Sequence, residues 1–74
     1  MKKQLLDNAL NKPIILILKI KSYKAYKGYL VKDDAPKRYK LLPLNIEEDI
    51  IVFPASYVKK YTFLYNNITI TGEK

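Results

Sequence analysis

The stretch IVFPASYVKKYTF, residues 51 to 63, decides the fold that we expect for this chain. The apolar run from Ile50 to Phe53 predicts a short buried strand. Pro54 ends that strand, and the small residues after it suit a single tight helical turn. From Val58 to Tyr65 the alternation of side chains is typical of a further strand. Two strands joined by one helical turn indicate the corner of a small, strongly bent β-structure.

Upstream of this corner, the apolar pattern predicts three strands in a meander. The first follows Pro13, and its apolar side chains recur at alternate positions from Ile14 to Ile20. The second spans residues 26–32 around Gly28, and a glycine inside a strand marks a sharp bend or a close backbone approach. A turn at residues 33–36 then leads into the third strand at residues 38–44.

The two ends of the chain add a helix and a sixth strand. Residues 2–11 carry leucine and alanine at helical spacing, and so short a helix must dock on the rest of the protein to be stable. Near the other end, Asn66-Asn67 predicts a two-residue hairpin turn that places Phe63 opposite Ile70. We therefore expect a single domain over residues 1–74, with a helix at 2–11 and a barrel at 13–71.

The composition excludes several classes of enzyme. The 74 residues include no cysteine and no histidine, so a disulfide, a thiolate metal site and a Ser-His or Cys-His catalytic pair are all unavailable. Phosphate-loop, dinucleotide-binding and zinc-binding patterns are also absent. Asp33 and Asp34 could hold a magnesium ion, but turn aspartates more often bond nearby backbone amides. We expect a non-enzymatic protein without a cofactor or a metal.

The chain also lacks the patterns of a membrane protein. Its longest apolar run, from Ile14 to Leu18, is far too short to span a bilayer. Lysines occur near the N-terminus, but Asp7 and Asn8 interrupt the apolar region that a signal peptide needs. We expect a cytoplasmic protein that does not bind a membrane.

The net charge is +7, and most of it lies between Lys19 and Lys40. A local positive excess attracts polyanions, and it excludes a DNA mimic, which needs carboxylates at such positions. Almost all of the basic residues are lysines, which is also typical of AT-rich coding sequence. The excess therefore marks either a polyanion site or the composition of the genome. A small basic protein of this composition also suits an accessory role in a mobile element.

Lysines and tyrosines follow one another closely in this basic stretch, which suggests a surface for RNA or single-stranded DNA. Lysines would follow the phosphates, tyrosine rings would stack on unpaired bases, and Arg38 would hold a phosphate through two hydrogen bonds. The candidate binding residues are Lys19, Lys21, Tyr23, Lys24, Lys27, Lys37, Arg38 and Lys40. Alternatively, these side chains only solvate a bent strand and block pairing at a sheet edge. The rival hypothesis is a protein-interaction module that binds one partner protein through a barrel edge or an apolar face.

Together these segments resemble the Sm/LSm/Hfq-like branch of the small SH3-like barrels. The resemblance covers roughly residues 4 to 64: the helix LLDNAL, the strand PIILILKI, the bent strand KGYLVKDD, the stretch from Tyr39 to Leu44 and the corner quoted above. It implies an all-β, SH3-like or Sm-like barrel of five or six strands with a short N-terminal helix. The two RNA-contact motifs of the family are not matched. APKRYK has no asparagine after the aspartates, and Phe53-Pro54-Ala55 replaces Arg-Gly or Lys-His.

The resemblance also bears on assembly. Sm-like barrels close into rings by pairing the edges of their fourth and fifth strands. Here the predicted sixth strand, Ile68 to Thr71, would cover the edge of the fifth strand, and a covered edge cannot recruit a neighbour. We therefore expect a monomer or a dimer rather than a ring.

Overall fold

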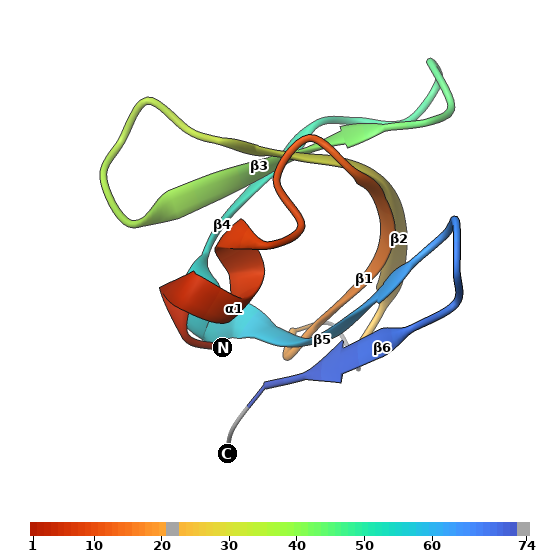
Figure 1. Ribbon diagram of the computed structural model, residues 1–74. Coiled ribbons are helices and arrows are strands. Elements are labelled where there is room, and N and C mark those ends of the chain that lie inside the picture. Colours follow the sequence, from red (N-terminus) through yellow and green to blue (C-terminus); the bar gives the residue numbers. More distant parts are fainter. Residues whose placement is uncertain (21–22, 73–74) are drawn as a thin grey trace.

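The computed structural model describes residues 1–20 and 23–72, which form one six-stranded antiparallel sheet and a short helix (Figure 1). In chain order the elements are α1 (Lys3–Asp7), β1 (Pro13–Leu18), β2 (Ala25–Lys32), β3 (Arg38–Pro43), β4 (Ile51–Pro54), the 3-10 helix η1 (Ala55–Tyr57), β5 (Val58–Phe63) and β6 (Thr69–Thr71). The predicted all-β class, the six strands and the one-turn corner are confirmed.

The strand order across the sheet is β4-β3-β2-β1-β5-β6. Four strands follow one another as hairpins, and β5 then returns to the other side of β1, with Ile14 opposite Phe63. The sheet curls strongly around the core (Figure 1). Within the described residues, its edge strands β4 and β6 are not paired with each other, so the sheet is not closed and the predicted barrel is not confirmed.

The core fills the concave side of this sheet. Alternate side chains of β1 point inward, as predicted, and Ile14, Leu16 and Leu18 are fully or almost fully buried. The other buried side chains come from every strand except β6, from η1 and from the N-terminal segment: Met1, Leu6, Ala9, Leu30, Tyr39, Leu41, Phe53, Ala55, Val58, Tyr61 and Phe63. No described charged side chain is buried.

The N-terminal helix is shorter than the predicted span of residues 2–11, because α1 ends at Asp7. The next residues leave the helix to pair with β2. Leu10 forms a parallel bridge with Leu30, and the Asn11 amide donates to the Leu30 carbonyl at 2.6 Å. Asn11 has a positive φ of 64°, which a helix does not allow. Pairing with β2 therefore replaces the last predicted turns of the helix.

Two buried tyrosines hold α1 against both halves of the sheet. The Tyr39 hydroxyl, from β3, donates to Asp7 Oδ1 at 2.5 Å. The Tyr61 hydroxyl, from β5, donates to the Leu5 carbonyl at 2.6 Å. Because β3 and β5 lie on opposite sides of the central strands, the helix bridges the open side of the curved sheet.

Gly28 is needed for a close approach of two strands. Neither glycine of the described chain has a positive φ, so any bend at Gly28 does not use the backbone region that glycine adopts most freely. Instead, a Cβ at Gly28 would overlap the carbonyl group of Leu42 on β3, with its carbon only 2.8 Å away. Real Cβ atoms almost never come so close to backbone, so β2 and β3 can pair here only around a glycine.

The hairpin between β5 and β6 differs from the prediction in its register. Tyr61 lies opposite Ile70, and the Phe63 amide donates to the Ile68 carbonyl, so the loop has four residues, 64–67. A two-residue turn of the predicted type needs positive φ at both positions, and only Asn67 has it. The Asn66 side chain instead accepts a hydrogen bond from the Ile68 amide. The prediction that β6 covers the edge of β5 is confirmed.

Candidate functional site

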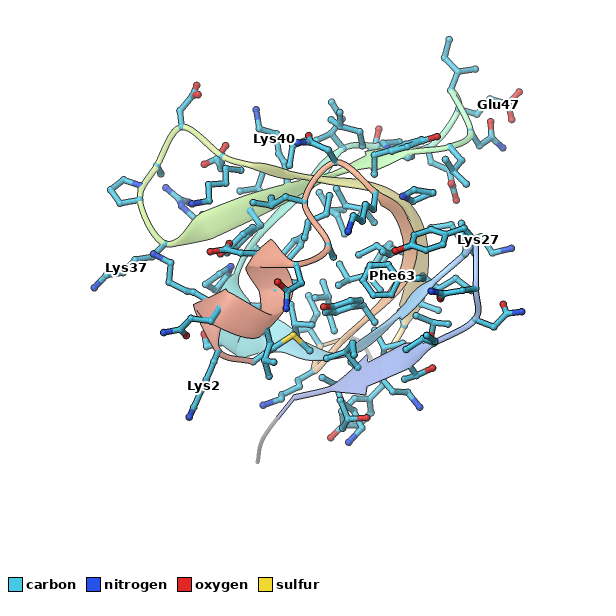
Figure 2. The ribbon with its side chains drawn as sticks, in the orientation of Figure 1. Lys2, Lys27, Lys37, Lys40, Glu47 and Phe63 are labelled. Carbon is cyan, nitrogen blue, oxygen red and sulfur yellow. The ribbon has the colours of Figure 1, made fainter. Side chains whose placement is uncertain are left out.

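The predicted binding residues do not form one patch (Figure 2). Lys19, Tyr23, Lys24 and Lys27 lie where β1 ends and β2 begins, whereas Lys37 and Arg38 lie at the far end of β2, where β3 begins. Figure 2 shows Lys27 and Lys37 on opposite sides of the molecule. Lys40, in β3, belongs to the second group, because its ammonium contacts the same Asp33 carboxylate as Arg38 does. Lys21 lies outside the described residues.

The η1 corner builds the first of these groups. The Lys19 amide donates to the Tyr57 carbonyl at 2.7 Å, and Leu18 pairs with Val58. The amino group of Met1 donates to the carbonyls of Ala55 and Val58 at 3.0 and 3.3 Å, which fixes the corner further. These contacts bring η1 and the start of β5 beside the end of β1. The Tyr23 surface, as we name it, consists of Lys19, Tyr23, Lys24, Tyr57 and Lys59, all of them exposed.

Tyr23 stands out on this surface by its backbone and its exposure. Its φ is +61°, a region that bulky side chains rarely adopt, and 56% of the residue is exposed. Its amide donates to the Ile20 carbonyl at 3.0 Å, which holds it in a turn. The Lys59 ammonium lies 5.4 Å from the centre of its ring, within the range of a cation–π contact. An aromatic ring is thus presented to solvent beside a positive charge.

The lysines of the Tyr23 surface and the neighbouring Lys27 form no ion pair with the described acidic residues. No ion pair joins Lys19, Lys24, Lys27 or Lys59 to an aspartate or glutamate in residues 1–20 and 23–72. Lys24 instead places its ammonium 5.4 Å from the centre of the Tyr26 ring. An anion at the Tyr23 surface would therefore meet exposed ammonium groups that form no ion pair, although Lys24 and Lys27 line one pocket together with Glu47, Glu48 and Asp49.

The second group is partly neutralised by Asp33. The Lys40 ammonium lies 3.8 Å from one Asp33 carboxylate oxygen, and Arg38 Nε lies 4.0 Å from the other. The same carboxylate accepts a hydrogen bond from the Ala35 amide, which is the turn role expected for an aspartate here. A shallow pocket of about 260 Å³ at this turn is lined by Lys3, Lys32, Asp33, Asp34, Ala35, Pro36, Lys37, Arg38 and Tyr39. Two carboxylates in the lining weaken its attraction for phosphate.

Two tyrosines have a raised pKa, and both serve the fold. Burial raises the pKa of the Tyr39 phenol, and the hydrogen bond that it donates to Asp7 and the negative charge of Asp7 raise it further. Burial also raises the pKa of Tyr61, and electrostatic interaction with the nearby Tyr65 makes a smaller contribution in the same direction. Both hydroxyls already donate to α1, so their environment reflects the docking of the helix.

The described residues offer no site for a metal ion. Within residues 1–20 and 23–72, no three of the acidic side chains gather closely enough to hold one. Asp33 and Asp34 are adjacent in the chain, but Asp33 is already engaged by Lys40, Arg38 and the Ala35 amide. Within the same residues, neither helix has the length or the apolar character needed to cross a membrane.

A second exposed surface lies on the convex side of the sheet and is apolar. Tyr29 on β2 lies opposite Leu42 on β3, and both are well exposed. Continuing the β3–β4 register by one residue places Leu42 opposite Ile50. Val52 follows on the same face of β4. The outer apolar row, as we name it, consists of Tyr29, Leu42, Ile50 and Val52.

Tyr57 and Lys59 were not among the residues proposed from the sequence. They lie far from Lys19 in the chain, and only the pairing of β1 with β5 brings them together. The sequence predicts the corner itself. It does not predict that the corner pairs with the end of β1 near Lys19.

Comparisons with known proteins give no relative on which to build. No protein-family model matches the chain, no curated protein matches its sequence, and no solved structure matches its fold.

Proposed function

We propose that the protein is a small, non-enzymatic nucleic-acid-binding protein whose Tyr23 surface binds single-stranded RNA or DNA. Exposed lysines suit the phosphates, and the exposed rings of Tyr23 and Tyr57 suit stacking on bases. The observation that carries the proposal is Tyr23 itself. It combines a strained backbone with an exposed ring, so the fold gains little from a tyrosine at this position.

The same proposal includes an SH3-like architecture. Its support is the antiparallel order β4-β3-β2-β1-β5 together with a one-turn helix between β4 and β5. That arrangement is what the resemblance to Sm-like barrels implies. The N-terminal helix, docked through Tyr39 and Tyr61 across the open side of the sheet, is consistent with it.

The test is binding of a labelled single-stranded oligonucleotide, followed by fluorescence anisotropy over a salt series. The affinity should fall steeply with salt, with a slope of about −0.7 for each phosphate neutralised. Reversing Lys19, Lys24 and Lys59 to glutamate should abolish binding. The matched control reverses Lys3, Lys12 and Lys32, three exposed lysines outside this surface, and should weaken binding far less.

Two results would contradict the proposal. Absence of binding at low salt would remove nucleic acid as a partner. Equal loss in the two charge-reversed variants would mean that the net charge alone, and not the Tyr23 surface, attracts the oligonucleotide.

The outer apolar row favours a second candidate, a protein-interaction module. Contiguous exposed apolar side chains on a small protein mark surfaces that bind other proteins. The row adjoins β4, an edge strand, so a partner could contact side chains and backbone together. Failure of nucleic-acid binding at low salt would leave this candidate as the proposed function.

A further inference from the structure

The edge formed by β4 has free backbone groups. Strand β4 pairs with β3 on one side, and no described backbone hydrogen bond joins its other side to any part of residues 1–20 and 23–72. Natural proteins usually protect such an edge with charged side chains, a proline or a bulge. The strand has Pro54 at its last position and no charged residue from Ile51 to Phe53. Most of this edge is therefore open to pairing with another strand.

Side chains along this edge are also apolar and exposed. Val52 points to the convex face with 47% of its surface exposed, and Ile50 precedes it on the same face. Together with Leu42 and Tyr29 they form the outer apolar row, which runs from the middle of the sheet to its edge. A strand added beside β4 would extend the sheet and place one of its own side chains beside Val52 on the convex face.

The two ends of the edge carry opposite charges. Before β4, the exposed loop contains Glu47, Glu48 and Asp49, and Glu47 projects away from the sheet (Figure 2). At the other end of β4, Pro54 lies opposite Arg38, which follows Lys37. The edge is thus preceded by an acidic loop and apolar in its middle, and its end lies beside basic residues of the neighbouring strand β3.

We propose that β4 pairs antiparallel with β4 of a second copy of this chain, with the two-fold axis at Val52. An antiparallel pair places the beginning of one strand beside the end of the other. Ile50 of each copy then lies opposite Pro54 of its partner, so the acidic loop before Ile50 approaches the end of the partner sheet that carries Arg38 and Lys37 one strand further in, and the charges match by symmetry. This inference does not rest on the proposed nucleic-acid binding, because it uses none of the Tyr23 surface.

The position of the axis follows from the alternation of side chains. With Val52 opposite its own copy, Ile51 lies opposite Phe53 of the partner, and the core-facing positions of the two strands stay on one face. In a ring, β4 would instead pair with β5 of the next copy. That pairing is not available, because β5 already has β1 on one side and β6 on the other. A short strand gives few hydrogen bonds, so the dimer should dissociate on dilution and weaken with salt.

The first experiment uses a single cysteine, because the chain has none of its own. Directly opposite residues in antiparallel strands have Cα atoms about 4.5–5.5 Å apart, which a disulfide can bridge. The full chain carrying Val52→Cys should form a covalent dimer under mild oxidation. Thr71→Cys, exposed on the other edge strand β6, is the matched control and should remain monomeric. Equal cross-linking of the two variants, or none at Val52→Cys, would overturn the proposal.

The second experiment needs no cross-link. Sedimentation of the unmodified protein over a concentration series should show a monomer–dimer equilibrium that shifts toward monomer in high salt. Val52→Lys places two ammonium groups together at the axis and should weaken the dimer at least tenfold, whereas Thr69→Lys on β6 should not. Val52→Lys changes an exposed position, and its melting curve verifies that it still folds. A monomer at every concentration, or a closed ring, would overturn the proposal.

Discussion

Tyr23 shows how a single residue can be unfavourable for the fold and favourable for binding. Its positive φ carries a cost of about 1–3 kcal/mol for a bulky side chain. Asparagine tolerates this backbone region well. We therefore expect Tyr23→Asn to leave the melting temperature unchanged or raised, while the affinity for single-stranded nucleic acid falls about 5- to 150-fold, because one stacked base is worth about 1–3 kcal/mol.

The control for Tyr23 is Tyr29→Asn, an exposed tyrosine on the outer apolar row with an ordinary strand backbone. This variant should lose some stability and keep its binding. A variant Tyr23→Asn that binds as well as the original protein would contradict a stacking role for this ring.

Gly28 is the second residue whose replacement has a defined consequence. A Cβ at this position meets the backbone carbonyl of Leu42, which cannot move without shifting β3. Gly28→Ala should therefore lower the free energy of unfolding by about 1–3 kcal/mol, and Gly28→Val by more. For a domain of this size, each kcal/mol corresponds to a fall of about 4–8 °C in the melting temperature.

Ala25→Val is the control for Gly28, because Ala25 is exposed on the same strand and the change only raises strand propensity. It should be nearly neutral. Unchanged melting of Gly28→Ala would mean that β2 and β3 are farther apart than the structure has them.

At the scale of elements, the attachment of α1 should depend on pH. The pKa of Tyr39 is raised in the folded state, so the folded protein keeps this proton while the unfolded chain releases it above about pH 10. Stability from this group is therefore complete below about pH 10 and is lost as the pH rises further, by up to about 1.4 kcal/mol per pH unit.

Tyr39→Phe tests this docking contact. The variant lacks the hydrogen bond to Asp7 and should be less stable by about 1–3 kcal/mol at neutral pH. Its loss of stability above pH 10 should also be shallower than that of the original protein, as measured by chemical denaturation at several pH values. Tyr57→Phe, at an exposed tyrosine, should change neither the stability at neutral pH nor its loss above pH 10. If Tyr39→Phe lost stability above pH 10 as steeply as the original protein, the titration of Tyr39 would not be the cause of that loss.

Local patterns in the sequence were enough to predict most of the elements. Alternation identified the buried face of β1, and Pro54 with the small residues after it identified the corner. The end of α1 was not predictable, because Leu10 and Asn11 leave the helix only to pair with Leu30 of β2. The register of the last hairpin depended on the Asn66 side chain, which the Asn-Asn pattern alone does not reveal.

The candidate site was less predictable than the elements, because closeness in the chain and closeness in the folded protein differ for its residues. Lys19, Tyr23 and Lys24 are close in the chain, so their grouping followed from sequence. Lys37 and Arg38 looked like part of the same stretch, but the length of β2 separates them from the others. Tyr57 and Lys59 join the surface only through the pairing of β1 with β5, which local patterns do not specify.

At the scale of the whole molecule, the position of β6 limits how copies can assemble. Strand β5 has β1 on one side and β6 on the other, from Lys60 opposite Thr71 to Thr62 opposite Thr69. A ring built by pairing β4 of one copy with β5 of the next is therefore not available. We expect no species larger than a dimer by native mass spectrometry, and a hexamer or heptamer would show that β6 detaches from the sheet.

The return of β5 to β1 also governs how fast the protein can fold. Strands β1 to β4 pair with their neighbours along the chain, and β5 with β6 forms a second local hairpin. The pairing of β1 with β5, with Ile14 opposite Phe63, joins the two pieces within the sheet, and closing so long a loop is a slow step. Substitutions that weaken the β1–β5 pairing should slow refolding in stopped-flow measurements. Substitutions confined to β6 should mainly speed unfolding, because that strand can pair with β5 after the folding transition state, in which β1 and β5 come together.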